Sequence, residues 1–209
     1  RYLSRERRMV RSAKAKFNKV VRLWGPKGPG ARMAGKTPAE KKSRTLAALY
    51  WVAMSRFMLI DMQFEDYMKL DLPRKLNFNP RYPRKMKRAQ KKFAAWAENK
   101  AKGLAKLRKR YEQVIVLKQA HWAIAATARI GMLFHNFARQ LFDAPIPTHL
   151  RTDMEKNAYR DELQKYADPL LMKAKQGYFL CLKTAKQYNW FNKWSRLCEK
   201  EINDLEPEK

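Results

Sequence analysis

Apolar residues recur at helical spacing along most of this chain. In six segments they return every three or four residues, the interval that places side chains on one face of an α-helix. No segment alternates apolar and polar residues as a half-buried strand would. The pattern therefore predicts six helices, over about residues 10–24, 37–72, 84–117, 120–143, 152–187 and 191–205.

Glycine and proline separate these helices. Alternating Gly and Pro at 25–30 ends the first helix, and three prolines within 73–83 require a loop. Thr37, Pro38 and Glu40 form the pattern of a capping box that starts the second helix. Asp168-Pro169 predicts a kink or a restart in the fifth. We expect an all-α fold of antiparallel helical hairpins, with residues 1–36 as a basic helix and Gly/Pro linker and residues 37–209 as one helical domain.

The charge of the chain is high and uneven. Among 209 residues, 47 are Lys or Arg and 19 are Asp or Glu, which gives a formal net charge of +28. Residues 1–44 carry +13 and residues 74–118 carry +14, whereas residues 119–209 carry only +3. A protein this basic attracts polyanions, so nucleic acid, anionic lipid, cell-wall polymer and acidic protein are the partner classes to consider. With 45% apolar residues the chain can also bury a core.

The third predicted helix carries the second basic block on the face opposite its apolar residues. We expect this strip to bind an anionic partner, and a merely solvated face is the alternative. Its aromatic residues Phe93, Trp96 and Tyr111 fall on the apolar face, where core packing is more common than base stacking. The strip consists of Arg81, Arg84, Lys85, Lys87, Arg88, Lys91, Lys92, Lys100, Lys102, Lys106, Arg108, Lys109 and Arg110.

Residues 30–37 match the phosphate-loop pattern G-x-x-x-x-G-K-[ST], and Asp61 after an apolar run resembles a magnesium-binding aspartate. Phosphate loops connect a buried strand to a helix, so that backbone N–H groups converge on the phosphates. Here a Gly/Pro segment precedes the motif, Thr37 is explained as a helix cap, and Asp61 lies inside a helical stripe. We therefore expect no nucleotide hydrolysis.

Other candidate chemistry is sparse. His121, His135 and His149 lack the spacing of a metal-binding helix, and we expect His135 on a helix surface or at the edge of the core. No grouping of residues suggests nucleophilic or acid–base catalysis, so we expect a non-enzymatic protein without a cofactor or metal. Cys181 and Cys198 lie on consecutive predicted helices and could face each other, although small buried thiols are the commoner outcome.

No apolar run reaches the roughly 20 uninterrupted residues that span a bilayer. The nearest, residues 46–60, is short and contains Arg56, and we interpret it as part of a buried helix. The first residue is Arg rather than Met, from which we expect a trimmed or processed chain whose signal peptide, if encoded, lies upstream.

Motifs in the second half resemble a known family. Ile130-Gly131 with Phe134 resembles the first-helix pattern of a tetratricopeptide repeat, and Ala174, Tyr178 and Cys181 resemble the pattern of its second helix. The order of residues 122–131, 144–147, 166–170 and 188–194 is similar to that of tetratricopeptide-like envelope proteins associated with gliding-motility machinery in myxobacteria and their relatives. The resemblance covers about residues 45–207. The second helix is longer than in the usual repeat, and residues 1–44 have no counterpart.

This resemblance implies a tetratricopeptide-like α-solenoid with long helices. It also implies a non-enzymatic scaffold in the bacterial periplasm that binds other proteins of an envelope complex. The cationic strip would then dock an acidic partner or an anionic surface. A cytoplasmic nucleic-acid-binding protein is the alternative. Five aromatic residues either frame an open repeat face or belong to the core: Trp122, Phe134, Tyr178, Trp190 and Trp194.

Overall fold

The computed structural model describes residues 2–25, 28–32 and 35–205, and within these ranges it contains only helices. The all-α class is therefore confirmed, and each of the six predicted helices is present. The elements are α1 (Tyr2–Trp24), the short 3-10 helix η1 (Pro29–Arg32), α2 (Pro38–Met68), α3 (Pro83–Ile115), α4 (Ala120–Phe142), α5 (Asp153–Gln187) and α6 (Lys193–Leu205).

The helix ends follow the local sequence. Thr37 Oγ1 accepts a hydrogen bond from Glu40 N at the start of α2, as predicted, but the Glu40 carboxylate accepts from Lys36 N and does not close the capping box. A complete capping box begins α5, where Thr152 and Glu155 bind each other's backbone N–H groups. Pro169 lies inside α5 without interrupting the helix.

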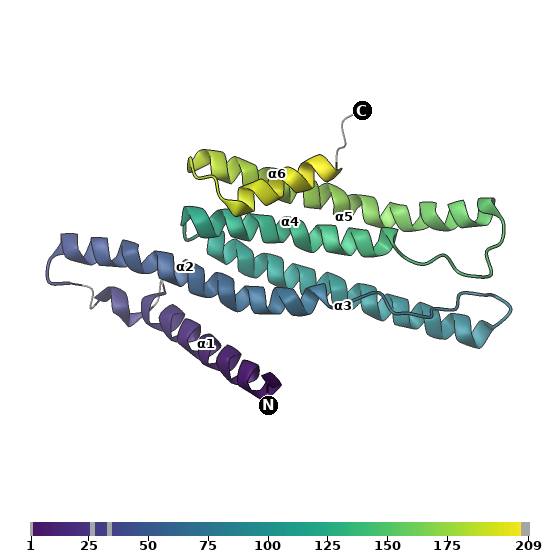
Figure 1. The fold of residues 1–209 in the computed structure, drawn as a ribbon, viewed down its shortest axis with the longest axis horizontal. Coiled ribbons are helices and arrows are strands. Elements are labelled where there is room, and N and C mark those ends of the chain that lie inside the picture. Colours follow the sequence, from purple (N-terminus) through teal and green to yellow (C-terminus); the bar gives the residue numbers. More distant parts are fainter. Residues whose placement is uncertain (1, 26–27, 33–34, 206–209) are drawn as a thin grey trace.

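Helices α2 to α5 run side by side along the long axis of the molecule, and α1 and α6 flank them on opposite sides (Figure 1). The centre is α4, which contacts α2, α3, α5 and α6. Its many alanines let these neighbours approach, and thirteen of its 23 residues are buried. The hydrophobic core therefore surrounds α4, and α1 lies at its margin.

Two glycine residues allow α4 and α5 to pack closely against each other. A Cβ atom built on Gly131 would lie 2.6 Å from the ring of Tyr178, and one on Gly177 would lie 2.8 Å from the Cα atom of Gly131. Any larger side chain at either glycine would push the two helices apart. The Tyr178 ring is fully buried against this contact.

A disulfide joins Cys181 of α5 to Cys198 of α6. The expectation of two small buried thiols is therefore wrong. Both residues are fully buried, and the hairpin between α5 and α6 brings them together although 17 positions separate them in the sequence. The disulfide fixes the short helix α6 over α4 and α5.

An ion pair inside the bundle connects α2 to α4. The Arg129 guanidinium donates to both carboxylate oxygens of Asp61, at 2.7 and 2.9 Å, and Tyr111 OH of α3 donates to the same carboxylate at 3.0 Å. Arg129 also lies 4.3 Å from the ring centre of Phe64. Asp61, the residue that resembles a magnesium ligand, is thus occupied by a structural contact among three helices.

Candidate functional site

The basic strip of α3 lies at the surface. All of its predicted members are exposed except Arg110, which is half-buried, and Lys100. Apart from Arg81, which lies in the turn before it, they lie on α3 (Figure 1), which runs on the side of the bundle away from α5 and α6. We call this surface the α3 cationic face: Arg81, Arg84, Lys85, Lys87, Arg88, Lys91, Lys92, Lys102, Lys106, Arg108, Lys109 and Arg110.

Few cations of this face are neutralised by the protein itself. Lys102 pairs with Glu98 at 2.6 Å, and Arg108 pairs with Glu112 at 3.2 Å. Within the described part of the chain, no other member has a carboxylate at ion-pair distance. The charge of the face therefore acts outward, on whatever approaches it.

Lys100 does not belong to the face, although the sequence places it in the basic block. Its side chain is fully buried, and its Nζ donates to the carbonyl oxygens of Tyr67 at 2.9 Å and Leu70 at 3.0 Å. It thus binds carbonyl groups at the C-terminal end of α2. Burial lowers the pKa of Lys100 to about 8. The signal was present in the sequence, because Lys100 lies four residues after Trp96 and four before Leu104, on the apolar face.

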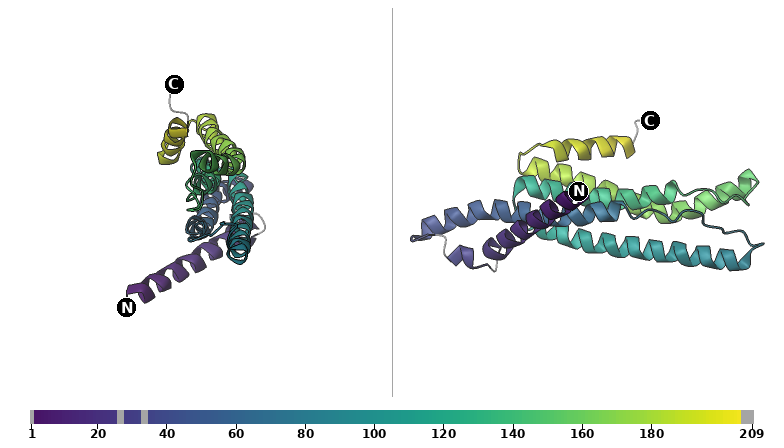
Figure 2. Two further views of the ribbon diagram at one scale, coloured as in Figure 1. Left: turned by 90° about the vertical axis from the view of Figure 1, so that its right-hand side faces the viewer. Right: turned by 60° about the horizontal axis from the view of Figure 1, so that its bottom comes forward.

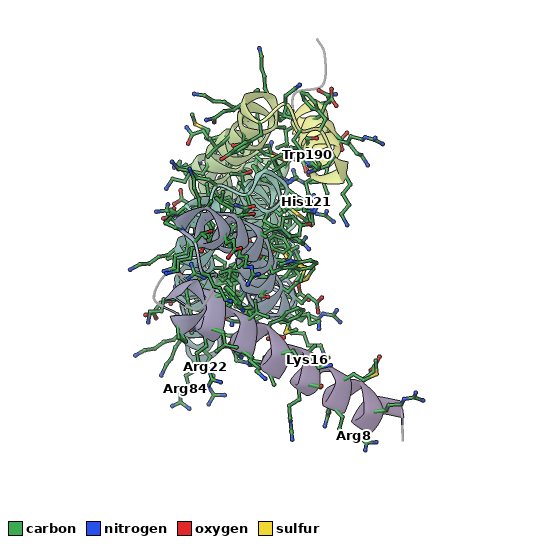
Figure 3. The ribbon with its side chains drawn as sticks, turned by 90° about the vertical axis from the view of Figure 1, so that its left-hand side faces the viewer. Arg8, Lys16, Arg22, Arg84, His121 and Trp190 are labelled. Carbon is green, nitrogen blue, oxygen red and sulfur yellow. A yellow bond between two sulfur atoms is a disulfide. The ribbon has the colours of Figure 1, made fainter. Side chains whose placement is uncertain are left out.

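Cations of α1, which belong to the first basic block, lie on the same side of the molecule as the start of α3. Helix α1 contacts only α2 and η1 among the described residues, and it leaves the bundle at a steep angle (Figure 2). Seen along the long axis, Arg8, Lys16 and Arg22 of α1 and Arg84 of α3 all lie on the lower side of the molecule, whereas Trp190 lies toward the opposite side (Figure 3). Only the tertiary structure brings these cations of the two basic blocks to one side.

A cleft adjoins the face at the N-terminal end of α3. It has a volume of about 800 Å³ and lies between residues 79–82 and residues 148–155, which include Arg81, His149 and Arg151. Glu155 also lines it, but its carboxylate accepts from the backbone N–H groups of Arg151 and Thr152, which lowers its pKa. The cleft continues the cationic surface around the end of the molecule.

The phosphate-loop motif does not form a phosphate site in the part that the structure describes. Residues 33 and 34 of the motif lie outside the described residues. Helix α1 precedes the motif and the 3-10 helix η1 covers its first residues, where a phosphate loop needs a buried strand. At the start of α2, Glu40 Oε2 lies 2.9 Å from Lys36 N and receives its hydrogen bond. A carboxylate of the chain itself thus occupies the end of the helix where a phosphate would bind.

The histidines make ordinary side-chain contacts. His135 Nδ1 lies 2.9 Å from Glu201 Oε2 and 3.2 Å from Tyr178 OH, at the edge of the core. His121 packs against the ring of Trp122, and burial, with a smaller effect of Lys193, lowers its pKa. In the described ranges no three His, Cys, Asp or Glu side chains are grouped as metal ligands would be.

The five aromatic residues proposed for a repeat face do not form one. Trp122, Phe134 and Tyr178 are buried, and Trp194 is half-buried against Phe57 and Arg129. Only Trp190, in the turn between α5 and α6, is exposed, at 51%. Four of the five therefore pack in or against the core around α4.

One described helix, α2, is long and apolar enough to cross a membrane by length and composition alone, with 33% of the relevant window buried in the bundle. The same composition is found in core helices of other proteins. Here α2 carries Asp61 in its central ion pair, and its half-buried Arg56 donates to the carbonyl of Gln113 at 3.4 Å.

Comparisons with protein-family models, with curated protein sequences and with solved structures find no match to this chain. The relation to the envelope family therefore stays a prediction from sequence motifs.

Proposed function

We propose that this protein is a non-enzymatic helical scaffold that docks an acidic partner protein, or an anionic surface of the cell envelope, through the α3 cationic face. The observation that carries the proposal is the row of exposed and mostly unpaired cations along one helix. An acidic partner would pair each buried cation with a carboxylate, so that no charge would be buried without a partner. Such charge complementarity gives both fast association and specificity.

The rest of the molecule fits a scaffold. The tight pairing of α4 and α5 at Gly131 and Gly177 supports a tetratricopeptide-like hairpin as the unit on which the basic helices are mounted. The disulfide between Cys181 and Cys198 supports an oxidising compartment such as the periplasm, because structural disulfides are rare in a reducing cytosol.

A nucleic-acid-binding protein is the second candidate, because Arg8, Lys16 and Arg22 of α1 lie on the same side of the molecule as Arg84 of α3 (Figure 3). A duplex with one phosphate charge per 1.7 Å would neutralise both helices. The two candidates differ in which polyanion binds at physiological salt.

Binding of labelled poly-L-glutamate and of a mixed-sequence DNA duplex, measured by fluorescence anisotropy across ionic strength, separates the candidates. We expect poly-L-glutamate to bind at least as tightly as DNA. A variant with Lys87, Arg88, Lys91 and Lys92 changed to Gln should bind it about tenfold more weakly, since each lost contact removes a favourable charge interaction. Preferential binding to DNA at physiological salt would support the second candidate instead.

The matched control changes four exposed cations outside the face, Lys183, Lys186, Arg196 and Lys200, to Gln. It has the same net charge as the test variant. If the control loses as much affinity as the test variant, overall charge governs binding and the α3 cationic face has no special role.

The compartment is tested by alkylating free thiols during lysis of the native host and measuring the masses of the peptides that contain Cys181 and Cys198. An extracytoplasmic scaffold is expected to retain the disulfide. Two alkylated thiols would place the protein in a reducing compartment.

A further inference from the structure

Among the described side chains of α1, residues 5–24, an apolar stripe follows one face of the helix, and only its second half is covered. Its apolar stripe consists of Val10, Ala13, Phe17, Val20 and Trp24. Phe17, Val20 and Trp24 are half-buried, and Val20 and Trp24 pack against the core. Val10 and its neighbour Met9 are 53% and 64% exposed, because the helix has left α2 at that point (Figure 2).

Cations border the uncovered stripe on both sides. At about 100° per residue, Arg7 and Lys14 fall on one side of it and Arg5 and Lys16 on the other. The helix holds eight Lys or Arg residues and one acidic residue, Glu6. Within the described residues, no carboxylate pairs with any of these cations. An apolar seam with cations on both flanks matches a helix that has an apolar seam and acidic flanks.

The position of α2 argues against a lipid bilayer as the partner of this stripe. The stripe is one line on one helix, and α2, with a diameter of about 10 Å, already lies on its second half. A bilayer tangent to the first half would collide with α2. An occupant of helical width can lie beside the first half, just as α2 lies beside the second.

We propose that the first half of α1 binds an acidic amphipathic helix of a partner protein. This helix would pack on the first half of the apolar stripe, as α2 packs on the second half. This inference rests on the proposed function, since both require an acidic partner, and it adds a second contact with its own apolar component. Glu6, four residues before Val10, lies on the stripe and opposes an acidic occupant.

The probe is a synthetic helical peptide with Leu at the first and fourth positions of each seven-residue repeat and Glu at the flanking positions. The control peptide has the same charge, with each Leu replaced by Gln. Binding of both to the full chain is measured by fluorescence anisotropy at physiological ionic strength. We expect the Leu peptide to bind about tenfold more tightly than the Gln peptide, because it buries Val10 and Met9.

Two exposed positions test the stripe without disturbing the core. Val10→Asp and, separately, Met9→Asp should each reduce the advantage of the Leu peptide to less than about threefold, with unchanged circular dichroism and unchanged thermal unfolding. Glu6→Gln should strengthen binding of the Leu peptide. Equal binding of the two peptides to the wild type, or an advantage that survives both Asp variants, would overturn the inference.

The outcome is separable from that of the proposed function. The variant with four Gln residues on α3 should leave the advantage of the Leu peptide over the Gln peptide in place, because that advantage arises at α1. If that variant abolishes acidic binding while the Asp variants have no effect, the α3 cationic face stands and the inference about α1 fails. Vesicles of phosphatidylglycerol that bind the wild type tightly, but not Val10→Asp, would also overturn the inference in favour of a lipid surface.

Discussion

Helices α1 and α4 each have 23 residues and an apolar stripe, yet they have opposite environments. Helix α4 contacts four other α-helices and buries thirteen residues, whereas α1 contacts α2 and η1, and its apolar side chains within residues 5–24 are at most half-buried. The difference shows where stability and binding reside. The helices around α4 hold the fold, and α1 and the outer side of α3 are left free to carry charge.

The most direct test of this contrast is the same substitution in both helices. Phe137 of α4 is 8% exposed and its ring centre lies 5.6 Å from that of Trp96, so Phe137→Ala should lower the free energy of unfolding by about 3–5 kcal/mol. Phe17→Ala in α1, where the side chain is half-buried, should lower it by about 1 kcal/mol. Urea denaturation measures both. Equal losses would mean that α1 is as much part of the core as α4.

Breaking the ion pair between α2 and α4 should cause the second-largest loss of stability. Asp61→Ala should cost about 3 kcal/mol, because it leaves the largely buried Arg129 without its partner and Tyr111 without its acceptor. The control, Glu162→Ala, removes a carboxylate that pairs with Lys165 on the exposed part of α5, and should cause no measurable change in urea denaturation. A small effect of Asp61→Ala would show that the pair adds nothing to the anchoring of α4.

The disulfide gives an effect of similar size at the other margin of α4. Reduction of Cys181–Cys198, which closes a loop of 17 residues, should destabilise the protein by about 3 kcal/mol, because the unfolded chain regains the freedom of that loop. Thermal unfolding with and without reductant measures the loss. The double variant with Ala at both positions should no longer respond to reductant, and a persistent response would locate the effect elsewhere.

The smallest effect is expected from the titration of Lys100. Burial lowers the pKa of Lys100 to about 8 in the folded protein, whereas an unburied lysine, as in the unfolded chain, has a pKa of 10.5. Between these values the unfolded chain binds more protons than the folded one, so stability from this group rises with pH. The difference in free energy of unfolding between the wild type and Lys100→Met should shift in favour of the wild type by about 1–3 kcal/mol from pH 7 to pH 10.5. A flat difference would mean that Lys100 is not desolvated.

Much of the architecture was readable from local patterns. Thr37 and Pro38 set the start of α2, and the prolines after residue 72 predicted the loop that leads to α3. The start of α4 at Ala120 and the end of α5 at Gln187 match the predicted positions. Such features depend on residues within one or two turns of helix, so a single sequence contains the information that fixes them.

Most of the errors concern contacts between distant segments, and one concerns spacing within a single helix. Cys181 and Cys198 pair because the turn after α5 aligns two helices, and neither position indicates this alone. Trp122 and Tyr178 are core residues because α4 has neighbours on all sides, whereas the same stripe could equally have faced a groove. Lys100 was assigned to the charged strip by composition, although its spacing from Trp96 and Leu104 placed it on the apolar face.

By itself the sequence determined the helical class, the helix positions and the concentration of charge in two blocks, because these follow from spacing and composition along one chain. Only the tertiary structure decided that cations of α1 and α3 lie on one side, that Cys181 and Cys198 meet, and that the first half of the apolar stripe of α1 is left uncovered. Packing between helices depends on which faces meet, and residues far apart in the sequence determine that together.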